Sequence, residues 1–150
     1  MNQEAVTILN DLVETLKDGE KGFSVAAEDT KDATLKTLFS TYSQERAACA
    51  RELQSLVTSL GGAPEQGGSV AGAAHRGWIN LKAAVTGRDD AAILSECERG
   101  EDYAKSDYKK ALDKTLPQEI RMVVERQYSA ILKSHDRVKA LRDQRKAASN

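Results

Sequence analysis

Residues 6–23 read VTILNDLVETLKDGEKGF, and apolar side chains recur in this stretch at the three- and four-residue spacing of one helix face. The positions on that face are Val6, Leu9, Val13, Leu16, Glu20 and Phe23. Glu20 stands where the pattern calls for a leucine. An ionised carboxylate in an apolar core is costly unless it is paired, protonated or bound to a cation. We therefore expect the neighbouring helices to supply a partner for Glu20.

Three further long segments repeat this interrupted pattern. Helix start and stop signals predict helices over about residues 2–29, 32–60, 89–115 and 117–146. The predicted faces of the last three run through Leu35, Leu38, Tyr42, Glu45, Cys49, Glu52 and Leu56, then Leu94, Cys97, Glu101, Ala104, Tyr108 and Ala111, and then Ile120, Val124, Gln127, Ile131, either His135 or Ser134, Val138 and Leu141. Their polar members are Glu45, Glu52, Glu101, Gln127 and either Ser134 or His135. No stretch alternates apolar and polar residues as a half-buried strand would. The sequence therefore predicts an all-α fold.

The second and third long helices are joined by a connection that holds a shorter helical segment. This segment is predicted over residues 69–86, with Trp78 facing the bundle. A helix of about 16 residues within this segment spans about 24 Å at about 1.5 Å per residue, enough to carry the chain back along the bundle. The predicted fold is a ferritin-like four-helix bundle with a short extra helix in this long crossover, which makes helices two and three parallel. Residues 1–150 are predicted to form one domain.

Four of the polar residues fall at a similar height. Counting from the helix ends places Glu20, Glu45, Glu101 and His135 within about 6 Å of one level. Carboxylates from separate helices with a histidine are typical ligands of iron or manganese, so these four are the predicted metal ligands. Glu52 is predicted to lie in a second polar layer nearer Gln127 and Tyr108. Whether Glu52, Glu98 and Gln127 belong to the metal site is left open.

A polar layer without metal is the alternative interpretation. The glutamates would then be protonated or paired with Arg46, Arg126 or Arg142 reaching inward, in a non-enzymatic stress-related or scaffolding bundle. In this interpretation, changing Glu101 to Gln should relieve repulsion among buried acids and leave the metal-free protein equally or more stable. Neither interpretation specifies a reaction, because no hydrolase triad or phosphate-binding glycine loop is recognisable.

Composition and charge limit the classes of partner that we expect the protein to bind. The formal net charge is −1 and acids and bases are interspersed, which argues against a nucleic-acid-binding stripe. No apolar run reaches the roughly 18 residues of a membrane span, and the first ten residues lack the pattern of a signal peptide. We therefore expect a cytoplasmic protein without membrane contact, with a homodimer as one possible assembly. Cys49 and Cys97 should remain free thiols, since their predicted heights differ by about 15 Å.

Four segments carry a resemblance to a known family. They are DGEKGF at 18–23, GGAPEQGGSVAGAAHRGW at 61–78, ERGEDYAKSDYKKAL at 98–112 and HDRVKALRD at 135–143. In this order and spacing, the chain resembles an uncharacterised bacterial family of ferritin-like four-helix-bundle proteins, catalogued as a domain of unknown function. The resemblance implies the bundle with a helix in the crossover, but no established activity. Ferritins and bacterioferritins share the placement of Glu20, Glu45 and Glu101, whereas their paired Glu-x-x-His motifs are missing here.

Overall fold

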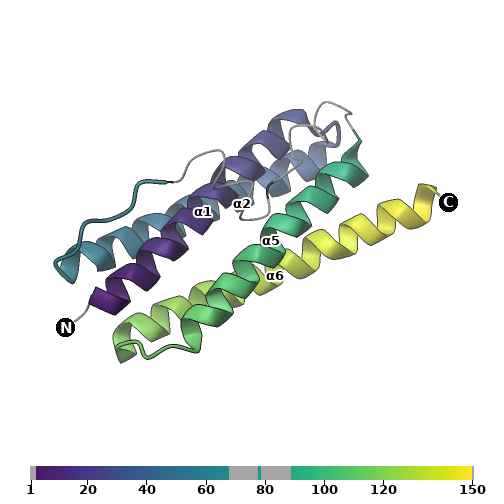
Figure 1. Ribbon diagram of the computed structural model, residues 1–150. Coiled ribbons are helices and arrows are strands. Elements are labelled where there is room, and N and C mark those ends of the chain that lie inside the picture. Colours follow the sequence, from purple (N-terminus) through teal and green to yellow (C-terminus); the bar gives the residue numbers. More distant parts are fainter. Residues whose placement is uncertain (1–2, 68–77, 79–88, 150) are drawn as a thin grey trace.

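Four long helices lie side by side in the computed structural model, which describes residues 3–67, 78 and 89–149 (Figure 1). Their bounds are Gln3–Asp29 for α1, Ala33–Ser59 for α2, Asp90–Leu112 for α5 and Gln118–Ser149 for α6. Every helix end lies within three residues of its predicted position, and the described residues contain no strand. The all-α four-helix bundle is thereby confirmed. The helix predicted over 69–86 lies outside the described residues, apart from Trp78.

The helices run in the directions that the long connection between α2 and α5 requires. Figure 1 shows α1 and α6 running one way and α2 and α5 running the other. The predicted parallel arrangement of α2 and α5 is therefore confirmed. Tertiary contacts are densest between α1 and α2, then between α5 and α6, and α1 joins the two pairs through α5. The backbones of α2 and α6 approach each other at few points, and these two helices are linked instead by side-chain hydrogen bonds and ion pairs.

Aspartate caps fix where two of the helices begin. The Asp32 carboxylate accepts hydrogen bonds from the backbone N–H groups of Thr34 at 2.8 Å and Leu35 at 3.1 Å. Asp89 caps α5 in the same way through Ala91. The Leu35 N–H and the guanidinium of Arg145 lower the pKa of Asp32, because both favour the carboxylate form. Since Arg145 lies near the end of α6, this cap also ties α6 to the start of α2.

Two apolar clusters fill the bundle, with a polar layer between them. One cluster contains the first half of α1 and includes Leu9, Leu53 and Tyr108. The other lies toward the α1–α2 turn and includes Phe23, Phe39, Leu94 and Cys97. Along each of α2, α5 and α6, a buried polar residue separates these clusters: Arg46, Glu101 and Ser134, respectively. The interrupted apolar faces in the sequence therefore correspond to one polar layer across the core.

Candidate metal centre

The four predicted ligands lie in different surroundings. Glu101 and His135 are buried, with 1% and 6% of their surfaces exposed. Glu45 faces solvent on α2, and the Glu20 side chain is 34% exposed and pairs with Lys17 at 3.4 Å. The structure therefore does not assemble the predicted group of four. Glu20 lies at the edge of the buried face of α1, and the inward position of α2 is held by Arg46 instead of its neighbour Glu45.

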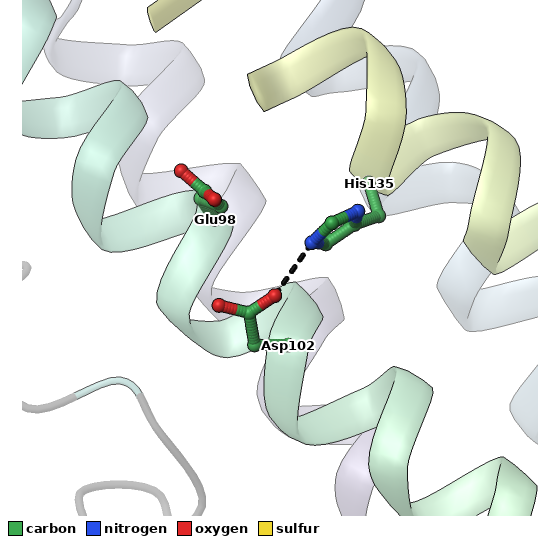
Figure 2. Close-up of side chains that lie close together, drawn as sticks. All are labelled: Glu98, Asp102 and His135. Carbon is green, nitrogen blue, oxygen red and sulfur yellow. Dashed lines mark hydrogen bonds and ion pairs between the residues drawn. The ribbon is translucent and has the colours of Figure 1, made fainter.

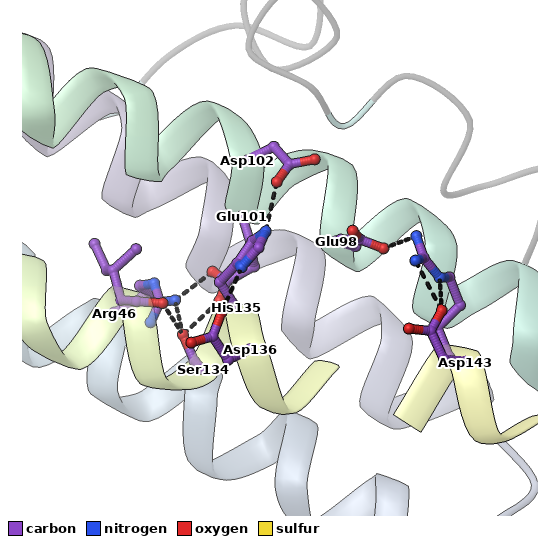
Figure 3. A network of polar contacts seen from close by, with 10 residues as sticks. Arg46, Glu98, Glu101, Asp102, Ser134, His135, Asp136 and Asp143 are labelled. Atoms are coloured by element: carbon purple, nitrogen blue, oxygen red, sulfur yellow. Dashed lines mark hydrogen bonds and ion pairs between the residues drawn. The ribbon is translucent and has the colours of Figure 1, made fainter. Parts of the chain in front are cut away.

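The mid-bundle position is occupied by an ion pair (Figure 3). An Nη2 hydrogen of Arg46 points at Glu101 Oε1, and the same nitrogen donates to Ser134 Oγ at 2.7 Å. The Ser134 hydroxyl in turn contacts the second oxygen of Glu101. The guanidinium also lies over the Phe23 ring, 5.5 Å from its centroid. The alternative in which Arg46 reaches inward to a buried glutamate is thereby confirmed.

This ion pair changes what the core can bind. Burial raises the pKa of Glu101, while the charge of Arg46 and the hydrogen bond from Ser134 act in the opposite direction. A divalent ion at Glu101 would lie beside a buried guanidinium, so the residues present do not fit a metal ion at this position. The expectation that Glu101→Gln leaves the metal-free protein equally or more stable assumed a group of repelling acids, and that assumption is wrong because Glu101 faces the cation of Arg46.

The predicted second polar layer is confirmed. Tyr108 donates its hydroxyl hydrogen to Gln127 Oε1 at 2.7 Å, and Gln127 Nε2 donates to Glu52 Oε1 at 2.8 Å. Arg126 pairs with the other oxygen of Glu52 at 2.5 Å. Burial raises the pKa of Tyr108 well above its ordinary value, so this hydroxyl stays protonated and remains a donor. Glu52 and Gln127 therefore belong to a hydrogen-bonded layer of their own.

A different group of ligand atoms meets where α5 contacts α6. Glu98, Asp102 and His135 each offer one oxygen or nitrogen, and these atoms lie within 4.8 Å of one another (Figure 2). Glu98 and Asp102 are four residues apart, which places them one turn apart on one face of α5. Within residues 3–67, 78 and 89–149, this is the one group of three such side chains.

Both ring nitrogens of His135 face carboxylates. Nε2 lies 2.5 Å from Asp102 Oδ1, and Nδ1 lies 3.1 Å from Oδ1 of Asp136 on its own helix. When Nδ1 carries the hydrogen donated to Asp136, Nε2 is directed at the α5 carboxylates as a ligand. Histidines that bind metals commonly donate their second ring N–H to a carboxylate in this way, which fixes the ring orientation.

The dimensions of this group suit one ion after a small adjustment. Oxygen and nitrogen ligands lie about 2.0–2.2 Å from a first-row ion such as zinc, so two ligands on opposite sides are about 4.2 Å apart. The widest separation, up to 4.8 Å, therefore has to close by about half an ångström, whereas His135 Nε2 and Asp102 Oδ1, at 2.5 Å, have to move apart by about one ångström to bind the same ion. Asp102 has room for this movement, because its side chain is 59% exposed. Two carboxylates with one imidazole suit Mn²⁺, Fe²⁺ or Zn²⁺.

Sequence reasoning found one member of this group and missed another. His135 was predicted as the nitrogen ligand, and Glu98 was left open. Asp102 was not considered, because it does not lie on the apolar face of its helix. The signal that could have found it is the four-residue spacing of Glu98 and Asp102, opposite a histidine on the antiparallel helix.

The fold and these contacts define a four-helix bundle with an ion-paired core and a carboxylate–histidine group between its last two helices. Residues 4–114 match the model of a family described as Domain of unknown function (DUF2383), and the chain belongs to that family. The predicted resemblance to a family of unknown function is thus confirmed, whereas a relationship to ferritins and a bacterial source stay predictions. No curated protein is significantly similar to the chain. None of the described helices is long and apolar enough to cross a membrane.

Proposed function

We propose that the protein is a metal-binding helical bundle, which takes one divalent first-row ion at Glu98, Asp102 and His135. The observation that carries this proposal is the setting of His135. Its ring is buried, Nδ1 contacts Asp136, and Nε2 points to a pair of carboxylates on the facing helix. An imidazole oriented by one carboxylate and aimed at others is the arrangement that metal sites use.

Mn²⁺ and Fe²⁺ are the ions we propose first, as the sequence predicted, with Zn²⁺ as the competing ion. Carboxylate oxygens outnumber the imidazole nitrogen, which favours ions that accept oxygen ligands. Three protein ligands would leave further coordination positions for water or a small oxygen donor, where the bound ion would act as a Lewis acid. Glu20, Glu45 and Glu101 are not part of this proposal, because the first two are exposed or paired elsewhere and the third faces Arg46.

Equilibrium dialysis against Mn²⁺ and against Zn²⁺ tests the site. We expect the wild-type protein to hold one ion per chain and the His135→Gln variant to lose it. The matched control is His75→Gln, which removes the chain's other histidine and should leave binding unchanged. Asp136→Asn should weaken binding by roughly 10–100-fold, since it removes the carboxylate that orients the ring. Wild-type affinity in the His135→Gln variant would contradict the proposal.

A scaffold without metal is the second candidate function. It is favoured by the two polar layers, in which Arg46 faces Glu101 and Arg126 faces Glu52, so neither layer depends on an added cation. Such layers can fix the register of helices in a rigid bundle. If the wild-type protein retains neither ion on dialysis, the scaffold is the function that remains.

A further inference from the structure

The α5–α6 contact contains two rungs of the same pattern, in each of which a basic side chain of α6 contacts one carboxylate on α5 and one on α6. His135 and Arg142 are seven residues apart and lie on one face of α6, opposite Asp102 and Glu98 on α5. Each α6 residue also contacts the aspartate that follows it in the sequence, which is Asp136 for His135 and Asp143 for Arg142. Figure 3 labels Asp102, His135 and Asp136 of the first rung and Glu98 and Asp143 of the second. Glu98 therefore lies in the metal group while it also pairs with a guanidinium.

This double position sets Arg142 against a metal ion. The side chains of Glu98 and Arg142 are only 10% and 20% exposed, so water screens their interaction weakly. A divalent ion held by Glu98, Asp102 and His135 would bring two further positive charges close to that guanidinium. The guanidinium and the divalent ion would repel each other, and both would have to share the Glu98 carboxylate. Both effects oppose simultaneous binding.

Arg142 already has a second partner that could retain it. Its Nη2 donates to Asp143 Oδ1 at 2.9 Å, and its Nε donates to the same oxygen at 3.2 Å. Asp143 is 57% exposed and belongs to the same helix, so it would move with Arg142. Releasing Glu98 would therefore leave the guanidinium hydrogen-bonded and its charge paired.

We propose that Arg142 is an internal competitor of the metal ion: it holds Glu98 in the metal-free protein and transfers to Asp143 when the ion binds. The inference rests on the proposed metal function and adds its regulation. The affinity for the ion is then set by how readily Arg142 leaves Glu98, and any partner or ligand that engages Arg142 would tighten metal binding.

Calorimetric titration of the full chain with MnCl₂ and with ZnCl₂ tests this competition. Arg142→Gln should tighten binding by roughly 5–100-fold, the range of coupling between two linked sites. Asp143→Asn should weaken binding, because Glu98 would then be the one of these two carboxylates left to pair with Arg142. The matched control is Arg126→Gln, which removes the same charge from α6 at its ion pair with Glu52 and should leave the affinity unchanged.

The outcomes separate this inference from the proposed function. Tighter binding in Arg142→Gln with weaker binding in Asp143→Asn supports the competition. If the wild type binds metal but Arg142→Gln binds it equally or more weakly, the inference is overturned while the metal site stands, and Arg142 then acts to position Glu98. If neither the wild type nor Arg142→Gln binds either ion, the metal site itself is overturned. Circular dichroism of each variant confirms folding, and Asp143→Asn provides a separate reading should Arg142→Gln fail to fold.

Discussion

Arg46 is the residue that decides the character of the core. A guanidinium is rarely buried, yet only 2% of Arg46 is exposed. Its cost of burial is offset by Glu101, by Ser134 and by the face of Phe23. The aliphatic stem lies against Gly19, where a Cβ would be 3.4 Å from Cγ of Arg46. The polar layer of the core therefore contains its own cation, Arg46, at the level where the sequence predicted a metal ion bound by carboxylates.

Removing the charge of Glu101 should destabilise the protein. Glu101→Gln would leave Arg46 buried without a counter-charge, which typically costs about 3–5 kcal/mol in the free energy of unfolding. Urea denaturation of the metal-free protein measures this loss. The matched control is Glu45→Gln, an exposed position on α2, where we expect a change within about 0.5 kcal/mol. Unchanged or higher stability in Glu101→Gln would show that the Arg46 pair does not form.

A double substitution distinguishes the ion pair from a general sensitivity of this position. Arg46→Met combined with Glu101→Leu removes both charges together and keeps the core filled. Such replacements of buried pairs are often neutral or stabilising, so the double variant should be clearly more stable than Glu101→Gln alone. Ser134 would keep a partner, since its hydroxyl also lies 3.0 Å from the Ile131 carbonyl oxygen.

At the scale of the helices, two glycines explain how the crossover meets the bundle. Gly22 on α1 and Gly100 on α5 both lie against the indole of Trp78, so closely that a Cβ at either position would overlap the ring. The ring also contacts Phe23 edge-on, with centroids 5.5 Å apart. Glycine inside a helix is less favourable than alanine, and a close approach by another group is one reason to find it there. At Gly22 the approaching group is a single side chain.

Filling one of these positions should displace Trp78. In Gly100→Ala the added methyl group has no room, and overpacking of this kind typically costs about 1–3 kcal/mol. Because Trp78 is the one tryptophan in the chain, its fluorescence should shift to the red as the ring leaves its apolar site. Gly19→Ala is the control, because its Cβ would meet Arg46 at an ordinary contact distance. That variant should keep the wild-type spectrum and gain up to about 1 kcal/mol from helix propensity. An unshifted spectrum in Gly100→Ala would mean that Trp78 does not occupy this site.

The apolar faces of α5 and α6 were predictable, whereas that of α2 was off by one residue. Leu94, Cys97, Glu101, Ala104, Tyr108 and Ala111 are all buried, as the spacing predicted. On α2 the predicted face ran through Leu38, Tyr42 and Cys49, which are half-buried, while Phe39, Arg46 and Ala50 are the buried set. Both sets have helical spacing and differ by a rotation of about 100°. Because arginine side chains are normally exposed, the face that contains Arg46 did not look apolar in the sequence.

That rotation also explains why the predicted metal ligands were only partly placed. It turns Glu45 toward solvent and directs Arg46 into the core, toward Glu101. Heights along the bundle depend only on residue number, so the polar layers were found at the right levels. The direction of each side chain around its helix depends on packing against partners, which one sequence does not specify. Asp102 lies beside the apolar face of α5, so following that face in the sequence does not find it.

For the molecule as a whole, the polar layer joins the two helix pairs. Arg46 on α2 reaches Glu101 on α5 and Ser134 on α6, and Trp78 contacts both α1 and α5. Separating α5 and α6 from the rest would therefore expose a buried ion pair as well as apolar surface. This coupling favours a single cooperative unfolding transition, in which stabilisation at one contact is felt by all four helices.

Metal binding should therefore stabilise the entire bundle and not only the α5–α6 pair. An ion that binds only the folded protein adds about 2.7 kcal/mol at a hundredfold excess over Kd. For a chain of this length, that corresponds to a rise in Tm of roughly 5–10 °C. Circular dichroism reports all the helices, whereas Trp78 fluorescence reports the contacts of its ring with Gly22 on α1 and Gly100 on α5. We expect Mn²⁺ to raise both midpoints equally in the wild type and neither in His135→Gln. A rise seen by circular dichroism alone would mean that α5 and α6 unfold separately from the α1–α2 pair.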